Sequence, residues 1–101
     1  MHVHLETTDD VGRERVTQLL QYSLNGHRED IDSMQLSVAT IQDPLGTKLH
    51  RCRLRALLRH GPPIEVEEVQ SRLDLTVTRA LERCVRTIQR RRRASMQRHF
   101  A

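Results

Sequence analysis

Aromatic residues are almost absent from this sequence of 101 residues, which has one Tyr, one Phe and no Trp. Proteins that read single-stranded nucleic acid stack its bases on exposed aromatic side chains, so a reader of that type is not expected. Long apolar runs are absent as well. No stretch approaches the roughly 20 residues of a membrane span, and the first residues lack the basic-then-apolar order of a signal peptide. We therefore expect a cytoplasmic protein that does not associate with membranes.

Motifs for catalysis and for cofactor binding are also missing. The sequence has no Gly-rich phosphate loop and no serine elbow, and Ser23, Ser33 and Ser95 have no evident base beside them. His2 and His4 share one face of a predicted strand, but no Cys or carboxylate cluster adds the spacing of a metal site. We expect no enzyme activity, no cofactor, no metal and no small-molecule substrate.

Cysteine is scarce, with Cys52 and Cys84 as the two examples. Both fall at apolar positions of predicted elements. Because a cytosolic compartment disfavours disulfides, we expect two buried free thiols.

The apolar residues that are present follow two different periods. Alternation predicts strands in residues 1–6, 32–42, 48–59 and 64–69, while helical spacing predicts helices in 7–26 and from Ser71 onward. Thr8, Asp9 or Asp10 can cap the first helix, and Asn25-Gly26 can end it. Turn residues at 43–46 and 61–63 predict that the last three strands form an antiparallel meander.

This order predicts an α+β fold with the sequence β-α-β-β-β-α. We expect a mostly antiparallel four-stranded sheet with two helices on one face, in a single domain of residues 1–93. Residues 94–101 are expected to form a flexible C-terminal tail. The apolar positions predicted to face the core are Val16, Leu19, Leu20, Leu24, Met34, Leu36, Val38, Cys52, Leu54, Ala56, Leu58, Ile64, Val66, Leu73, Val77, Ala80, Leu81, Cys84, Val85 and Ile88.

The net charge of +4 hides an asymmetry between the two halves of the chain. Residues 1–46 hold three Arg against eight acids, a net −5, and residues 47–101 hold fourteen Lys/Arg against five acids, a net +9. A half that is this basic is typical of a polyanion-binding protein, most often one that binds nucleic acid, although a mixed-sign surface that only confers solubility is the alternative.

Part of this charge forms a stripe along the second helix. At about 100° per residue, five arginines fall within a sector of roughly 80°, nearly opposite the apolar face, and span about 20 Å. This arginine stripe consists of Arg79, Arg83, Arg86, Arg90 and Arg93. Arg91 and Arg92 are expected to widen it at its end. Like charges at this spacing repel one another, and Glu82 is the one acid at the edge, so we expect contact with phosphates rather than a solvated helix face.

A second basic set lies on the third strand, where Arg51, Arg53 and Arg55 point to the open face of the sheet. Glu65 and Glu67 on the next strand share that face, so cross-strand ion pairing and RNA contact remain alternatives for these arginines.

The ordered elements resemble the ribosome hibernation-promoting factors, a family that includes ribosome-associated inhibitor A and the proteins once labelled sigma-factor modulation proteins. The resemblance covers residues 1 to about 93. It is carried by "MHVHLE", Leu19 and Leu20 of the first helix, "DIDSMQLSV", "LHRCRLRALLRHGPPIEVEEV" and "DLTVTRALERCVRTIQRRRR".

This resemblance, which is to the short form of the family, implies a fold related to the double-stranded-RNA-binding domain. It also implies binding to rRNA of the small ribosomal subunit, in the channel for mRNA and tRNAs, by a protein that is a monomer off the ribosome. Translation would then be blocked under stress or in stationary phase. Two alternatives are a protein-binding regulatory module, which would use the acidic first half, and a structured-RNA-binding domain that acts away from the ribosome.

Overall fold

The computed structural model describes residues 1–7 and 10–100 and shows the predicted order of elements. Strand β1 (His2–Thr7) precedes helix α1 (Asp10–Ser23) and a short 3-10 helix, η1 (Arg28–Asp30). Strands β2 (Ile31–Gln42), β3 (Lys48–Leu58) and β4 (Ile64–Gln70) follow, and helix α2 (Leu73–Phe100) ends the described chain. The α+β fold β-α-β-β-β-α is therefore confirmed, with η1 as an unpredicted addition.

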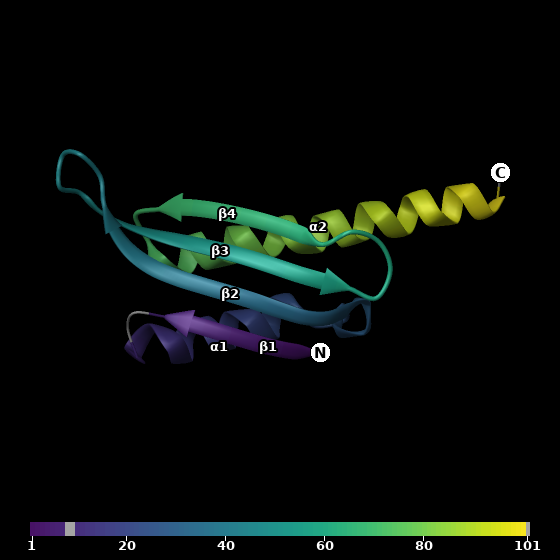
Figure 1. Cartoon of the computed structure of the whole chain (residues 1–101), viewed down its shortest axis with the longest axis horizontal. Coiled ribbons are helices and arrows are strands. Elements are labelled where there is room, and N and C mark those ends of the chain that lie inside the picture. Colours follow the sequence, from purple (N-terminus) through teal and green to yellow (C-terminus); the bar gives the residue numbers. More distant parts are fainter. Residues whose placement is uncertain (8–9, 101) are drawn as a thin grey trace.

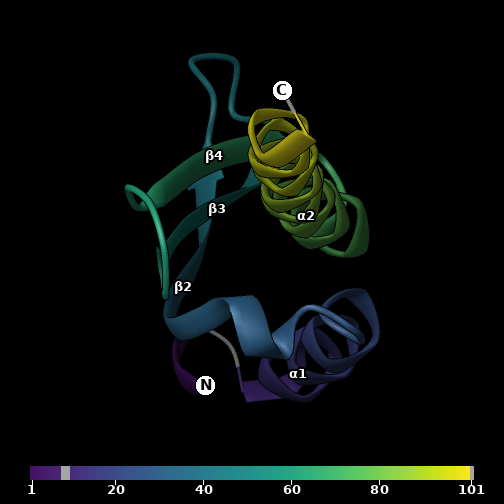
Figure 2. The ribbon, with the colours of Figure 1, turned by 90° about the vertical axis from the view of Figure 1, so that its right-hand side faces the viewer.

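The four strands lie side by side in the order β1-β2-β3-β4 (Figure 1). β1 runs parallel to β2, which requires the crossover through α1, because a tight turn cannot join parallel strands. β2, β3 and β4 form the predicted antiparallel meander. Both helices pack on the same face of the curved sheet (Figure 2), which leaves the other face open.

The turns of the meander follow from their residues. In the β2–β3 turn, the Asp43 carboxylate accepts hydrogen bonds from the backbone N–H groups of Leu45 at 2.9 Å and Thr47 at 2.8 Å. Gly46 has a φ of 84°, a conformation that side chains with a Cβ avoid. Of the residues proposed to cap α1, Thr8 and Asp9 lie outside the described residues, and so does the side chain of Asp10.

The core lies between the sheet and the two helices. Among the described side chains, one polar group lies in the core: Thr76 is fully buried, and its hydroxyl donates a 2.6 Å hydrogen bond to the carbonyl of Arg72, one turn earlier. Leu5, Leu19, Leu58, Leu73 and Val85 pack at its margin. The buried hydrophobic residues are Val16, Leu20, Leu24, Ile31, Met34, Leu36, Val38, Cys52, Leu54, Ala56, Ile64, Val66, Val77, Ala80, Leu81, Cys84 and Ile88.

Helix α2 is longer than the sheet that it covers. Its 28 residues span about 42 Å at 1.5 Å per residue, within a molecule whose longest dimension is 53 Å. Among the described side chains of α2, Ile88 is the last that is buried, and the helix beyond it extends past the sheet (Figure 1). Residues 94–100, predicted as a tail, continue this helix. No described helix is long and apolar enough to cross a membrane.

Candidate nucleic-acid interface

Most of the arginine stripe lies on the side of α2 that faces away from the core. Arg79, Arg86, Arg90 and Arg93 are exposed, whereas the buried residues of the same helix face the sheet and α1. Arg79, Arg86 and Arg93 make no ion pair with any described residue, and Arg90 donates a 3.3 Å hydrogen bond to the neutral hydroxyl of Thr87. We call these four residues the acid-free arginines. They carry four positive charges that nothing in the described part of the molecule neutralises.

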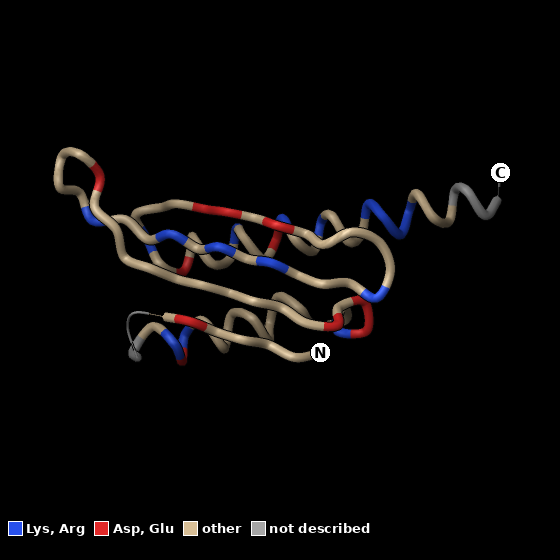
Figure 3. The backbone as a smooth tube through the Cα atoms, viewed as in Figure 1, with Lys and Arg blue, Asp and Glu red and all other residues tan. Residues whose placement is uncertain are grey.

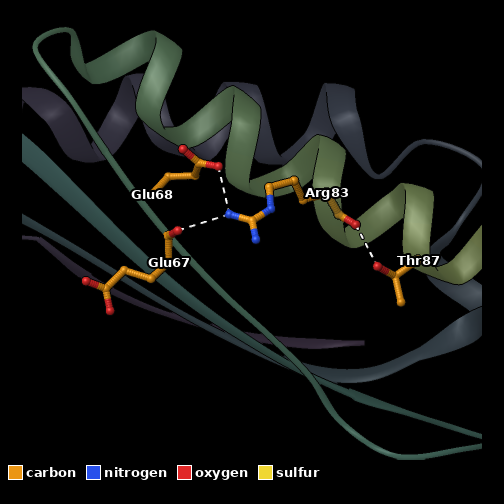
Figure 4. Close-up of polar contacts among 4 residues, drawn as sticks. All are labelled: Glu67, Glu68, Arg83 and Thr87. Atoms are coloured by element: carbon orange, nitrogen blue, oxygen red, sulfur yellow. Dashed lines mark hydrogen bonds and ion pairs between the residues drawn. The ribbon is translucent and has the colours of Figure 1, made fainter.

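Arg83 is an exception within the stripe. Its guanidinium reaches back to β4, where one nitrogen lies 2.8 Å from the Glu68 carboxylate and donates a 3.1 Å hydrogen bond to the backbone carbonyl of Glu67 (Figure 4). The side chain of Glu68 is only 15% exposed, so this ion pair is partly shielded from water. Arg83 therefore ties α2 to the sheet, and its charge is less available to a partner than those of the acid-free arginines.

The four consecutive arginines at positions 90–93 divide into two pairs. At about 100° per residue, Arg91 and Arg92 fall within roughly 60° of Ile88, on the side that packs against the body. Arg91 donates a hydrogen bond to the carbonyl of Pro62, in the β3–β4 turn, and Arg92 pairs with Asp30 of η1 at 2.6 Å. These two side chains reach toward the body of the protein and do not simply widen the stripe.

Two of the three strand arginines have acidic partners, in agreement with the ion-pairing alternative. Arg53 lies opposite Glu67 with a nitrogen–oxygen distance of 3.2 Å, and Arg55 lies opposite Glu65 at 3.3 Å. Figure 3 shows the resulting pattern as basic positions on β3 beside acidic positions on β4. Arg51 is half-buried and pairs with no described acid. A hollow on this face is lined by residues of both signs, which suits a polyanion less well than the outward side of α2.

The thiols lie in the layer between these two surfaces, and both are free and buried, as predicted. Burial raises the pKa of the Cys52 thiol from its ordinary value of 9.0 to about 12, and the negative charge of Glu68 adds to the rise. Burial also raises the pKa of Cys84 to about 11, against a smaller lowering by the Arg91 guanidinium. A neutral thiol is a poor nucleophile and a poor metal ligand, so these cysteines are structural. Among the described residues, no group of three or more His, Cys, Asp or Glu could hold a metal ion.

Neither family models nor curated proteins match this sequence. Solved structures do. The N-terminal domain of Protein Y from Thermus thermophilus superposes with a TM-score of 0.66 at 19% sequence identity, over 89% of this chain and 98% of that domain. A ribosomal subunit interface protein from Coxiella burnetii superposes with a TM-score of 0.67 at 14% identity, over 91% of this chain and 98% of that one.

The chain has the fold of the Protein Y N-terminal domain. The likeness extends over almost the whole of both neighbours and about nine tenths of this chain. It is consistent with the resemblance to the ribosome hibernation-promoting factors, and at these low identities it establishes the shared fold.

Proposed function

We propose that this protein is a ribosome-associated translation inhibitor that binds rRNA of the small subunit through the acid-free arginines of α2. In this proposal it is not an enzyme, and it acts in the cytoplasm as a monomer until it binds. The observation that carries the proposal is a row of arginines with no acidic partner among the described residues, on a fold that a ribosomal subunit interface protein also has. Shape and charge would determine recognition, because the chain has almost no aromatic side chains on which bases could stack.

The length of the row suits a phosphate backbone. Arg79 and Arg93 are fourteen residues apart, which is about 21 Å along a helix axis, so the four guanidinium groups can reach several successive phosphates. Arg83 would contribute less, since Glu68 already neutralises part of its charge. Arg51, Arg53 and Arg55 would be secondary contacts, reached only if the RNA displaces Glu65 and Glu67 from the last two.

A bound protein of this size in the channel for mRNA and tRNAs would prevent initiation, and this is the mechanism we propose for inhibition under stress or in stationary phase. The compact domain of residues 1–93 would occupy the channel, and residues 94–100, which continue α2, would extend from it.

The direct experiment is sedimentation of the purified protein with purified ribosomal subunits through a sucrose gradient. We expect it to travel with small subunits and with whole ribosomes, and to inhibit initiation in a reconstituted translation reaction. The proposal is wrong if the protein stays at the top of the gradient, or if it travels with large subunits alone.

A second candidate is a structured-RNA-binding domain that acts away from the ribosome. The acid-free arginines favour it equally, because phosphate contacts carry no sequence information. Competition separates the two. An excess of a 20-base-pair RNA duplex should displace a general RNA binder from small subunits readily, whereas a protein fitted to a ribosomal site should need far more competitor.

A further inference from the structure

The end of α2 beyond Ile88 projects from the sheet, yet two of its arginines reach back to the body. Arg92 pairs with Asp30 and Arg91 donates to the carbonyl of Pro62, so η1 and the β3–β4 turn both contact this segment. Arg90 and Arg93, on the opposite side of the same turn of helix, make no such contact with a described residue. The segment therefore has one side fastened to the body and one side free.

The acceptor of this ion pair is held in place by its own backbone. The N–H of Asp30 donates a 3.1 Å hydrogen bond to the carbonyl of His27, and the carbonyl of Asp30 accepts one of 3.1 Å from the N–H of Arg59, just past the end of β3. The Asp30 side chain is 25% exposed. A short, partly shielded contact between charged groups is stronger than an ordinary surface pair.

The acceptor of the second contact, the Pro62 carbonyl, also lies in a segment with a constrained backbone. Gly61 precedes Pro62 and has a φ of 90°, so the turn adopts a conformation that favours glycine. A Cβ at Gly61 would lie 3.4 Å from a guanidinium nitrogen of Arg91, which shows how closely this guanidinium packs over the turn.

Without the contacts of Arg91 and Arg92, the end of α2 would unwind easily. Beyond Ile88 no described side chain of α2 is buried, and Arg90 and Arg93 repel each other at a spacing of three residues. Helix ends with few buried contacts open at low free-energy cost. The phosphate-contacting row needs this segment to remain helical, because otherwise Arg90 and Arg93 leave the line that Arg79 and Arg86 define.

We propose that Asp30, Arg91 and Arg92 form a latch that holds the end of α2 against the body and so positions Arg90 and Arg93 for a polyanion. As a statement about binding, this inference rests on the proposed function. Although its own charge repels a polyanion, Asp30 then promotes binding, because it fastens Arg92 and with it the end of α2. Arg91 and Arg92 are positioning residues in this arrangement rather than principal phosphate contacts.

The test compares two neighbouring acids. Asp30→Asn and Glu29→Gln each remove one negative charge, but Glu29 is exposed and pairs with no described residue. Simple electrostatics predicts that both variants bind purified small ribosomal subunits slightly more tightly. The latch predicts that Glu29→Gln does so, whereas Asp30→Asn weakens binding about threefold to tenfold, because the helix end is then held in its binding position for a smaller fraction of the time. Equal tightening in both variants would overturn the inference.

Amide hydrogen exchange gives a readout that needs no ligand. In the Asp30→Asn variant, the backbone amides of residues 89–96 should exchange faster than in wild type, while the amides of residues 77–84 should exchange at the wild-type rate. In the Glu29→Gln variant, the exchange rates of both segments should equal those of wild type. If exchange responds in this way but no variant binds small subunits, the latch is correct and the ribosomal function is wrong. If exchange does not respond, the latch is wrong whatever the protein binds.

Arg92→Ala supplies a second variant, against Arg90→Ala as its control. Both remove one arginine from the same turn. Loss of a phosphate contact reduces the slope of log affinity against log salt by about 0.7 to 0.9. We expect that reduction for Arg90→Ala, and for Arg92→Ala weaker binding with a nearly unchanged slope. A full slope reduction in Arg92→Ala would assign it to phosphate contact and overturn its positioning role.

Discussion

The outward side of α2 and the open face of the sheet are both rich in arginine, but their arginines have different neighbours. On the sheet, Arg53 and Arg55 lie directly across from Glu67 and Glu65, within 3.3 Å. On α2, the acid-free arginines make no ion pair with a described residue. Arginine is thus neutralised by acids on the open face of the sheet, whereas on the outward side of α2 its charge is available to a partner.

The cause of this difference is the geometry of the two elements. Adjacent strands place side chains opposite one another, so Glu67 and Glu65 on β4 lie directly across from Arg53 and Arg55 on β3. The outward side of a surface helix has no neighbouring element, and an arginine there can pair only within its own helix or with a long reach back to the sheet. The Arg83 side chain extends back to the sheet and pairs with Glu68, so its charge is no longer fully available to a partner of the arginine stripe. Counting arginines therefore overstates a binding surface, and counting those without partners does not.

The largest effect should come from neutralising the outward side of α2. Replacing Arg79, Arg86 and Arg90 together by Gln removes three proposed phosphate contacts, and we expect binding to small subunits to fall by about 100-fold or more at moderate salt. Filter binding at several salt concentrations would measure it. Arg83 is left out, because its removal would also leave the partly shielded Glu68 carboxylate without its partner.

The matched control replaces Arg53, Arg55 and Arg59 by Gln, which makes the same change in net charge at arginines that already lie beside acids. All three are exposed and lie within 3.7 Å of an acid. We expect a loss of less than about fivefold, since charges that are already paired release few counterions. Equal losses in the two triple variants would mean that net charge alone governs binding and that the two surfaces do not differ.

The layer between the surfaces should respond to alkaline pH. Cys52 and Cys84 keep their protons in the folded state up to about pH 12 and 11, whereas in the unfolded chain they lose them near 9.0. Below about 9 both states are protonated and this contribution to stability is constant, but as pH rises from 9 toward 11 the unfolded state is favoured. We expect the free energy of unfolding, measured by urea denaturation, to decrease over this range. A Cys52→Ala/Cys84→Ala double variant should show a flatter decrease, and an equal decrease would show that the thiols are not buried in this layer.

Sequence patterns predicted the helices and strands, the outward side of α2 and the open face of the sheet. All of these depend on the periodicity of residues close together in the sequence. The alternation of Cys52, Leu54 and Ala56 with Arg53 and Arg55 determines which side of β3 faces the core, and the alternating spacing of four and three residues determines the outward side of α2. The end of α2 was less predictable. Its continuation to Phe100 rests on helix-forming residues with no further apolar period to mark them.

Contacts between distant residues could not be predicted in this way. Asp30 and Arg92 are 62 positions apart, and nothing in the chain near either residue indicates the other. The helical period by itself places Arg91 and Arg92 on the side of Ile88, so a stricter use of that period separates them from the stripe. The Arg83 contact is harder to predict, because the helical period places this residue on the outward side of α2. Only the length of its side chain and the position of β4 bring it to Glu68.

A smaller effect should follow from making the open face resemble α2. In a Glu65→Gln/Glu67→Gln variant, Arg53 and Arg55 lose their acidic partners and keep their positions on β3. We expect binding to a 20-base-pair RNA duplex to tighten several-fold with a steeper salt dependence, as two more cations become available. The free energy of unfolding should change by less than about 1 kcal/mol, because exposed ion pairs contribute little. An unchanged salt dependence would mean that the shape of the open face, rather than its pairing, keeps polyanions away.

The smallest effect should come from Glu82, the acid at the edge of the stripe. It is exposed, three residues after Arg79 and four before Arg86, yet it forms no ion pair with any described residue. Glu82 lies beside the acid-free arginines and holds none of them in place. The substitution Glu82→Gln should therefore remove only a weak repulsion between this carboxylate and a bound phosphate. We expect small subunits to bind less than about twofold more tightly, with the salt slope unchanged because no contact is gained. Weaker binding would mean that Glu82 orients Arg79 or Arg86 in solution, and those two arginines would then have an acidic partner just as the arginines of the sheet do.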